Sequence, residues 1–331
     1  MTNSVLLIGG AGYIGPIVAE HLLSLGNNVR VLDNLTNQNG FSLDGLLGRQ
    51  GFDFIQGDMG IPSDVERAAK GISSVILLAG LVGDPITKKY PEAAHQVNDI
   101  SISSCLETLS TCDIDRLVFI STCSNYGIVP ENQLADEETP LSPVSLYAKS
   151  KVEAERAVLS LVQSGKLNAC ILRFATAFGI SPRMRFDLTV NEFVRDLFLG
   201  KKLEVYDPDT WRPYCHVQDF ARIIELALAK ELRLINGEVF NAGSNGNNFT
   251  KRQIIEEILK VQTRKSEIVF LDKGKDMRNY RVNFDKVRSI LDFVPLYSVE
   301  LGIAEILGGL RSGCFLDKDE KYGNYSLFDL P

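Results

Sequence analysis

The stretch that decides the fold is Val5-Leu-Leu-Ile-Gly-Gly-Ala-Gly-Tyr-Ile-Gly15, an apolar run that passes directly into a glycine-rich loop. Its glycines form the pattern G-x-x-G-x-x-G, and Pro16 follows at a helix start, where its missing N–H costs little. Such glycines let the backbone turn tightly and approach a diphosphate, while the helix N-terminus supplies free N–H groups and a positive dipole end. The stretch therefore predicts the strand–loop–helix unit of a dinucleotide-binding fold.

Short apolar runs alternate with longer amphipathic stretches from this unit to about residue 175. Such alternation is typical of a parallel sheet buried on both faces. Ser63-Asp64-Val65-Glu66 has the spacing of a capping box, which predicts that a helix begins at Ser63. The predicted strands are Val5–Ile8, Val29–Leu32, Phe54–Gln56, Val75–Ala79, Arg116–Ser121 and Ala169–Phe174, and the predicted helices are Ile14–Leu25, Ser63–Lys70, Pro91–Ser110 and Leu146–Gln163.

The alternation loosens after residue 175, and 331 residues suggest two units at about 150 residues per domain. We predict an α/β protein with a Rossmann-type doubly wound parallel sheet over residues 1–175. A smaller, partly interleaved α/β substrate-binding unit is expected over residues 176–331. Its helical patterns lie at Asp187–Leu199, Val217–Leu228, Lys251–Gln262 and Val299–Leu307, and the stretch from about Asp317 has no assignment.

The composition narrows the choice of partner. Hydrophobic residues make up 45%, the net charge is −7, and no basic block occurs, so the electrostatic footprint of a nucleic-acid-binding protein is absent. The six cysteines and three histidines form no clustered metal-ligand pattern and no disulfide framework, which favours a reducing compartment. No apolar stretch approaches the ~20 residues that cross a membrane. We expect a cytoplasmic protein with a small-molecule partner, no metal, no nucleic acid and no membrane.

Two aspartates extend the dinucleotide hypothesis. Asp33 ends the second predicted strand, 24 residues after Gly9. A carboxylate there accepts hydrogen bonds from the adenosine ribose hydroxyls and repels a 2′-phosphate, so NAD is favoured over NADP. Asp58 follows the third strand, where it is either an adenine contact or an ordinary turn residue.

A tyrosine and a lysine share one helix face in Tyr147-Ala-Lys-Ser-Lys151. A phenol with a pKa of about 10 is a poor base at neutral pH, but a neighbouring ammonium favours the phenolate and brings it into range for proton transfer. Thr122, after the fifth predicted strand, supplies a hydroxyl that shares the proton of the substrate with Tyr147. The candidate catalytic residues are Thr122, Tyr147 and Lys151.

These residues resemble the extended short-chain dehydrogenase/reductases, within the NAD-dependent epimerase/dehydratase group that acts on nucleotide sugars. The resemblance runs from about residue 3 to residue 311 and rests on motifs in the right order. Beyond the glycine loop and Tyr147–Lys151 they are Leu32-Asp-Asn-Leu35, Leu78-Ala-Gly-Leu81, Ser121-Thr-Cys-Ser-Asn-Tyr-Gly127, Trp211-Arg-Pro-Tyr-Cys-His-Val-Gln-Asp219 and Met277-Arg-Asn-Tyr280.

The resemblance implies a tightly held NAD, a nucleotide-diphosphate sugar and a homodimer, with Pro91–Ser110 and Leu146–Gln163 as candidate interface helices. The implied NAD-binding residues are Gly9, Gly12, Tyr13, Ile14, Gly15, Asp33, Asn34, Asp58, Met59, Leu78, Ala79, Gly80, Asn98, Tyr147, Lys151 and Ala175. The candidate substrate-binding residues are Ser124, Thr176, Arg183, Arg185, Arg212 and Arg278, because guanidinium groups pair well with a diphosphate or an acidic sugar.

Departures from the family pattern reduce the number of reactions that this chain is expected to catalyse. Nucleotide-sugar 4,6-dehydratases carry Asp-Glu after the threonine, where this chain has Cys123 and Ser124, and decarboxylases carry Glu at the place of Ser124. Cys123 is also one residue away from the catalytic cysteine of 3,5-epimerising relatives, so its thiol is expected to pack. Val82 and Thr176 replace a lysine and an asparagine of galactose-type epimerases.

The leading hypothesis is an NAD-dependent epimerase that oxidises C4 of a nucleotide sugar, with C2 a weaker alternative, and returns hydride to the other face. An NDP-4-keto-6-deoxy-sugar reductase is the main alternative, and a dehydratase or decarboxylase is disfavoured by the departures. A non-catalytic dinucleotide sensor is a third class, since fold does not fix function.

Overall fold

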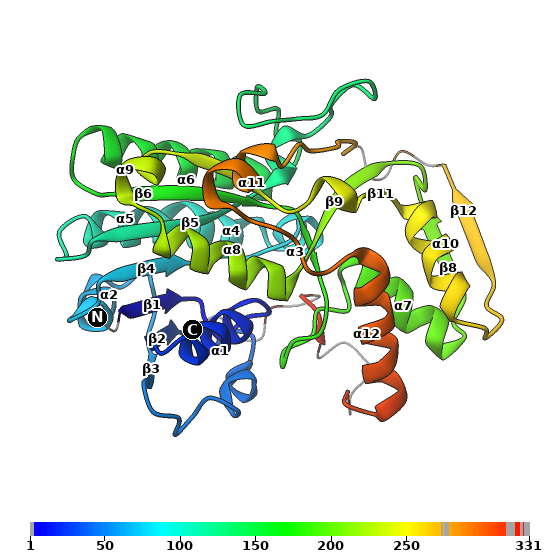
Figure 1. The fold of residues 1–331 in the computed structure, drawn as a ribbon, viewed down its shortest axis with the longest axis horizontal. Coiled ribbons are helices and arrows are strands. Elements are labelled where there is room, and N and C mark those ends of the chain that lie inside the picture. Colours follow the sequence, from blue (N-terminus) through cyan, green and yellow to red (C-terminus); the bar gives the residue numbers. More distant parts are fainter. Residues whose placement is uncertain (1–2, 273, 275–277, 316–321, 325–326, 328–331) are drawn as a thin grey trace.

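A seven-stranded parallel sheet forms the centre of the computed structural model, which describes residues 3–272, 274, 278–315, 322–324 and 327 (Figure 1). Met277 of the last quoted motif and most of the stretch after Asp317 lie outside the described residues. In spatial order the strands are β10 (Val239–Ala242), β6 (Ala169–Phe174), β5 (Arg116–Thr122), β4 (Ser74–Leu77), β1 (Ser4–Ile8), β2 (Asn28–Asp33) and β3 (Phe52–Gln56).

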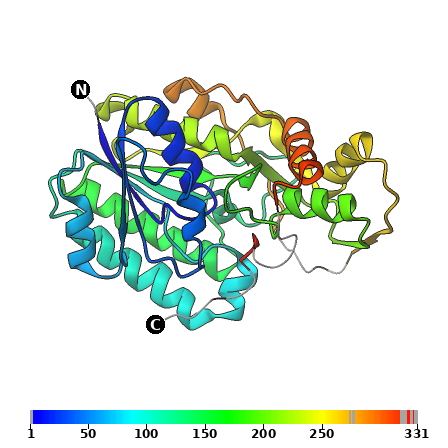
Figure 2. The ribbon, with the colours of Figure 1, turned by 90° about the horizontal axis from the view of Figure 1, so that it is seen from below.

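Helices cover both faces of this sheet (Figure 2). Side chains alternate along a strand, so Val5 and Leu7 of β1 enter one core with α1 (Gly15–Ser24) and α8 (Val217–Ala229). Leu6 and Ile8 enter the other core. That second core also contains residues of α2 (Pro62–Ala69), α5 (Ile102–Leu109) and α6 (Leu146–Gln163). The predicted Rossmann-type sheet, buried on both faces, is confirmed.

The capping box predicted at Ser63 is wrong. Helix α2 begins one residue earlier, at Pro62, whose fixed φ suits the first helical position, so Ser63 lies inside the first turn. Ile61 precedes the helix and makes no side-chain cap. A capping box does occur at Thr250 and Gln253, at the start of α10 (Lys251–Val261).

The helix predicted over Pro91–Ser110 is interrupted. It consists of α4 (Pro91–His95), a π-helical segment (Gln96–Ser101) and α5. The buried Asn98 in the π-helical segment accepts a hydrogen bond from the backbone N–H of Leu81 at 2.7 Å and donates one to its carbonyl at 2.9 Å. This pair of hydrogen bonds to a distant loop accompanies the widened helical turn. The periodicity of the sequence alone does not indicate that interruption.

A second region lies beside the main sheet (Figure 1). All four helices predicted after residue 175 are present, and the last extends to Ser312, but α8, the second of them, packs against the main sheet and not in this region. The region contains the sheet β11 (Asn248–Thr250)–β9 (Trp211–His216)–β7 (Thr176–Phe178), the pair β12 (Ile268–Leu271)–β8 (Leu203–Tyr206), and the helices α7 (Thr189–Leu199), α10 and α12 (Val299–Ser312). Since β10 pairs with β6, the chain beyond residue 175 also returns to the main sheet. The division into units at residue 175 stays a prediction.

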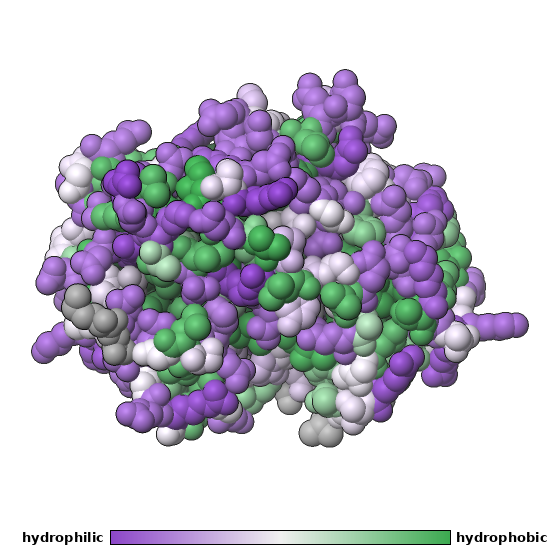
Figure 3. Space-filling model, viewed as in Figure 1, coloured by the Kyte–Doolittle hydropathy of each residue, from purple (hydrophilic) through white to green (hydrophobic). Residues whose placement is uncertain are grey.

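Shorter elements complete the fold, and the sequence patterns did not predict α3, α9 or α11. They are α3 (Asp84–Lys89), α9 (Leu232–Ile235), α11 (Asp285–Leu291) and the 3₁₀ turns Gly40–Leu43, Cys123–Tyr126 and Asn245–Asn247. The viewed surface is mostly hydrophilic, with scattered hydrophobic groups (Figure 3). Within the described residues, no helix has the length and apolar character needed to span a membrane.

Candidate active site

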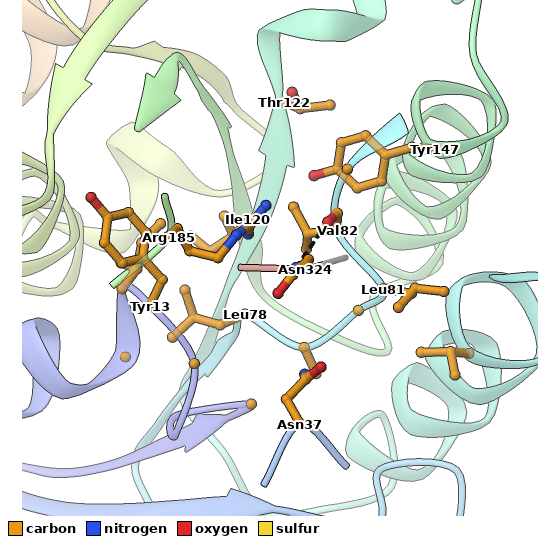
Figure 4. A pocket seen from close by; sticks show the side chains of 18 of the residues that line it. Tyr13, Asn37, Leu78, Leu81, Val82, Ile120, Thr122, Tyr147, Arg185 and Asn324 are labelled. Atoms are coloured by element: carbon orange, nitrogen blue, oxygen red, sulfur yellow. Dashed lines mark hydrogen bonds between the residues drawn. The ribbon is translucent and has the colours of Figure 1, made fainter. Parts of the chain in front are cut away.

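A cavity of about 330 Å³ lies at the carboxyl ends of the central strands, and side chains from several segments converge on it (Figure 4). Such a crevice is where open α/β sheets bind their ligands. Among the residues predicted from the sequence, those lining it are Gly9, Gly12, Tyr13, Ile14, Gly15, Asp33, Asn34, Asp58, Met59, Leu78, Ala79, Gly80, Thr122, Ser124, Tyr147, Lys151, Ala175, Thr176, Arg183, Arg185 and Arg278.

The glycine loop is a tight backbone cradle. Gly9 has φ +83°, and a Cβ there would lie 2.6 Å from the backbone of Ala79, so the position requires glycine. A Cβ on Gly15 would lie 2.2 Å from the carbonyl oxygen of Gly10. A Cβ on Gly12 would meet only the carbonyl of Gly9, at 3.5 Å. The first and third glycines therefore permit close packing, and the second leaves room in the cradle.

Asp33 is fixed to this loop. Its two carboxylate oxygens accept hydrogen bonds from the backbone N–H groups of Ala11 and Leu35, each at 2.9 Å. Burial raises the pKa of Asp33, while these hydrogen bonds and the Arg183 charge oppose that rise. Each oxygen keeps a lone pair for a further donor, as a ribose diol would require.

Asp58 is oriented in a similar way by its neighbours. One carboxylate oxygen accepts from the side-chain amide of Asn34 at 2.8 Å, and the other accepts from the backbone N–H of Gly60 at 2.7 Å. The prediction that Asp58 reaches an adenine stays a prediction.

Tyr147 lies in the first turn of α6, whose N-terminus is capped by Ser145 accepting from the N–H of Ala148 at 3.2 Å. Burial and the nearby Asp84 carboxylate raise the pKa of Tyr147, whereas Arg185 and a hydrogen bond with Thr122 lower it. Tyr147 and Arg185 enter the pocket from opposite sides (Figure 4). The half-buried phenol is thus subject to two opposite charges, Asp84 and Arg185.

Lys151 is one helical turn further along α6 and is only 2% exposed. Its ammonium donates to the carbonyl of Ile120 at 2.9 Å. Burial lowers the pKa of Lys151 to about 8, with Glu155 opposing the shift, so the amine remains mostly protonated at neutral pH.

The two residues after Thr122 are engaged elsewhere. The buried thiol of Cys123 donates to the carbonyl of Arg173 at 3.1 Å, and burial raises its pKa well above the usual value. This agrees with a packing role. The hydroxyls of Ser124 and Tyr280 are 3.2 Å apart, and both residues line the cavity.

The arginines predicted to bind substrate have different surroundings. Arg278 forms an ion pair with Asp84 at 2.6 Å. Arg185 forms a two-fold hydrogen bond with Asp187, at 2.7 and 2.6 Å. Arg212 is buried against Tyr280, with its guanidinium 5.1 Å from the ring centre, and donates to the carbonyl of Arg278.

Two predicted residues, Asn98 and Arg212, are not among those lining the cavity. Asn98 acts on the loop at Leu81 through its two backbone hydrogen bonds. Its predicted NAD contact and the diphosphate contact of Arg212 stay predictions.

The lining residues without an assigned role in the sequence analysis include Asp84, Tyr280 and Asn324. Tyr280 ends the motif Met277-Arg-Asn-Tyr280, so the sequence could have identified it as a site residue. Asp84 follows the apolar run of the fourth strand in Gly83-Asp84-Pro85. Asn324 lies in a polar stretch without any local pattern, and the sequence offers no signal for it.

A glycine cradle, a fixed acidic residue at the end of β2 and a Thr–Tyr–Lys group in one cavity define a dinucleotide-dependent oxidoreductase of the short-chain dehydrogenase type. The model of the NAD dependent epimerase/dehydratase family matches residues 5–243, and the chain belongs to this family. It is an enzyme of the extended short-chain dehydrogenase type, and NAD is its cofactor. The open cradle at Gly12 and the position of Asp33 fit that cofactor.

Similar proteins carry out different reactions. A UDP-glucose 4-epimerase of Streptomyces lividans is 28% identical over 83% of this chain and 86% of its own length. A dTDP-glucose 4,6-dehydratase of Streptomyces niveus is also 28% identical, over 93% of this chain and 92% of its own. The structure of UDP-glucose 4-epimerase of Thermus thermophilus in complex with NAD aligns with a TM-score of 0.80 at 26% identity, covering 93% of this chain and 99% of that one. Overall similarity therefore does not select the reaction.

Proposed function

We propose that the protein is an NAD-dependent epimerase that inverts C4 of a nucleotide-diphosphate sugar through a transient 4-keto intermediate. The observation that carries the proposal is a half-buried Tyr147, with Thr122 and Lys151, at a cavity in which the residues after Thr122 supply no carboxylic acid. This arrangement supports reversible oxidation of a hydroxyl and does not support elimination of water.

Tyr147 removes the proton from the sugar hydroxyl and later returns it, while Thr122 bonds the same oxygen. NAD, when bound, accepts a hydride from the sugar carbon and gives it back. Burial disfavours the phenolate, so nearby positive charge is needed to populate it. Arg185 lowers the pKa of Tyr147, and Lys151, one helical turn along α6, supplies a second cation. The sugar must present its other face before hydride returns, which inverts the carbon.

A dehydratase is disfavoured because Cys123 and Ser124 occupy the places of its acid pair. The Cys123 thiol is turned to a backbone carbonyl, and the Ser124 hydroxyl lies beside Tyr280. Asp84 lines the cavity and acts electrostatically on Tyr147, but it is ion-paired with Arg278. The C4 assignment draws on relatives named UDP-glucose and UDP-glucuronate 4-epimerases.

A 4-keto-sugar reductase uses the same catalytic groups, and the cofactor balance distinguishes it. The experiment first releases nucleotide from the purified protein by denaturation and measures its NAD content. UDP-glucose, UDP-glucuronate and dTDP-glucose, each deuterated at C4, are then incubated with the protein without added NADH. We expect bound NAD and an epimer that retains deuterium at C4. Turnover that requires added NADH, or a product that has lost water, would contradict the proposal.

The homodimer and the cytoplasmic location stay predictions. The candidate interface helices α5 and α6 lie on the same face of the main sheet. Sedimentation of the purified protein tests the dimer.

A further inference from the structure

The segment between β7 and α7 is fastened to the glycine loop by Tyr13. The Tyr13 hydroxyl donates to the carbonyl of Gly179 at 2.6 Å and accepts from the side chain of Asn191 at 2.9 Å. The hydroxyl of Ser181 donates to the backbone carbonyl of Tyr13 at 2.6 Å. All three partners of Tyr13 are distant in sequence, so these bonds fix the Ser181–Arg185 segment against the dinucleotide cradle.

Arg183, in this segment, is a buried charge with a neutral hydrogen-bond partner. It is 4% exposed, lines the cavity, and donates from Nη2 to the side-chain oxygen of Asn324 at 2.8 Å. Among the residues that the structure describes, no carboxylate lies within ion-pair distance of its guanidinium. Arg185 differs, since it is held by Asp187 at 2.6 Å.

An unpaired buried guanidinium is unfavourable unless an anion reaches it. Burial and the neighbouring Arg185 lower the pKa of Arg183 to about 10, so it is still charged at neutral pH. The carboxylates of Asp187 and Asp33 also act on Arg183 electrostatically, but Asp187 is held by Arg185. The bond from Ser181 to the backbone of Tyr13 keeps the segment with Arg183 beside the glycine loop, at the cofactor end of the cavity. Asp33 already accepts hydrogen bonds from the backbone of the glycine loop, so we expect a ligand to supply the anion that pairs with Arg183.

We infer that Arg183 binds the diphosphate of NAD, and that Asn324 is a positioning residue that holds its guanidinium toward the glycine loop. The side-chain amide of Asn324 also donates to the carbonyl of Val82 at 3.0 Å (Figure 4). Asn324 therefore joins Arg183 to the loop after β4. This assignment replaces the substrate role expected for Arg183 from the sequence.

The diphosphate of the nucleotide sugar is the other anion that could bind Arg183. Its candidate partner Arg278 has other neighbours, namely Asp84 and the Tyr280 ring region near Ser124. The inference rests on NAD as cofactor and does not depend on the sugar or on the carbon that is inverted. Binding measured without any sugar nucleotide therefore tests it separately from the proposed function.

The test compares Arg183→Met, which removes the charge, with Arg183→Lys, which keeps it, and with Arg278→Met as the matched arginine of the other end. Protein freed of nucleotide is titrated calorimetrically with NAD, ADP-ribose and adenosine, and with UDP. We expect Arg183→Met to weaken NAD and ADP-ribose by about 10- to 100-fold and Arg183→Lys by less, because a charge-assisted hydrogen bond is lost or reduced. Adenosine, which has no diphosphate, is expected to bind both variants as it binds the parent.

Asn324→Ala is expected to weaken NAD less than Arg183→Met, and to have no further effect in the Arg183→Met background. Arg278→Met is expected to weaken UDP and leave NAD unchanged. The inference is overturned if Arg183→Met weakens UDP and not NAD, or if it weakens adenosine as much as ADP-ribose. Because Arg183→Lys keeps the charge and nearly the length, it provides the same comparison if Arg183→Met does not fold.

Discussion

The two ends of the cavity are built on different principles. At the cofactor end, the cradle comes from consecutive backbone positions, and Arg183 has no acidic partner among the described residues. At the substrate end, polar groups from distant segments already bind one another, as in the pairs Asp84–Arg278 and Ser124–Tyr280. The cofactor end is therefore preorganised for an anion, whereas a substrate must exchange partners to bind at the other end.

The largest expected effect is on the catalytic step itself and leaves the cofactor end of the cavity unchanged. Tyr147→Phe removes the proton-transferring hydroxyl and leaves the ring, so kcat is expected to fall by at least about 10²- to 10⁴-fold. The NAD content of the purified variant should equal that of the parent, because the cradle is untouched. Steady-state rates and nucleotide release measure the two quantities, and appreciable activity in the variant would sink the role of Tyr147.

Two glycine variants test the cradle itself. Gly15→Ala places a methyl 2.2 Å from the carbonyl of Gly10, and this overpacking should lower the free energy of unfolding by about 1–3 kcal/mol. Gly12→Ala meets only the Gly9 carbonyl at 3.5 Å, so the fold is expected to persist while NAD affinity drops. Urea unfolding and NAD titration distinguish the two. Equal stability loss in both variants would show that the second glycine is also structural.

At the substrate end, Asp84→Asn is expected to change the pH profile. The Asp84 carboxylate raises the pKa of Tyr147, so its removal lowers that pKa. A base must be deprotonated to act, hence the rising limb of kcat/KM should move to lower pH. Rates over pH 5–10 measure the shift, with Asp84→Glu as the charge-preserving control. An unmoved or oppositely moved limb argues against this coupling.

The smallest expected effect is on the stability of the fold and comes from Glu192 of α7, which does not line the cavity. Burial and Asp196 raise its pKa from 4.5 to about 7. The unfolded chain then loses its proton before the folded one, so stability falls as pH rises from about 4.5 to 7. Glu192→Gln should raise the free energy of unfolding by about 1–2 kcal/mol at pH 8 and have little effect at pH 4.5. Urea unfolding at the two pH values checks this, and NAD binding should not change.

Local patterns predicted six of the seven strands of the central sheet, because inner strands such as β1, β4 and β6 are nearly continuous apolar sequence buried on both faces. They did not predict the edge strand β10. They failed where a distant contact governs the backbone. Asn98 bonds Leu81 and lies within the π-helical interruption of an otherwise regular helix, and Pro62 starts α2 ahead of the apparent cap at Ser63. Short helices such as α3 hold too few residues for a periodic signal.

Local sequence was enough to predict the dinucleotide cradle, Asp33 and the candidate catalytic residues Thr122, Tyr147 and Lys151. The cradle is local, since Gly9, Gly12 and Gly15 lie within seven residues, and Tyr147 and Lys151 are one turn apart on one helix. Which charges are paired depends on the tertiary structure. Asp84 and Arg278 are 194 residues apart, and Arg183 meets Asn324 across 141 residues. Such partners are chosen by how distant segments pack, because ion pairing requires contact within about 4 Å and carries no local signature.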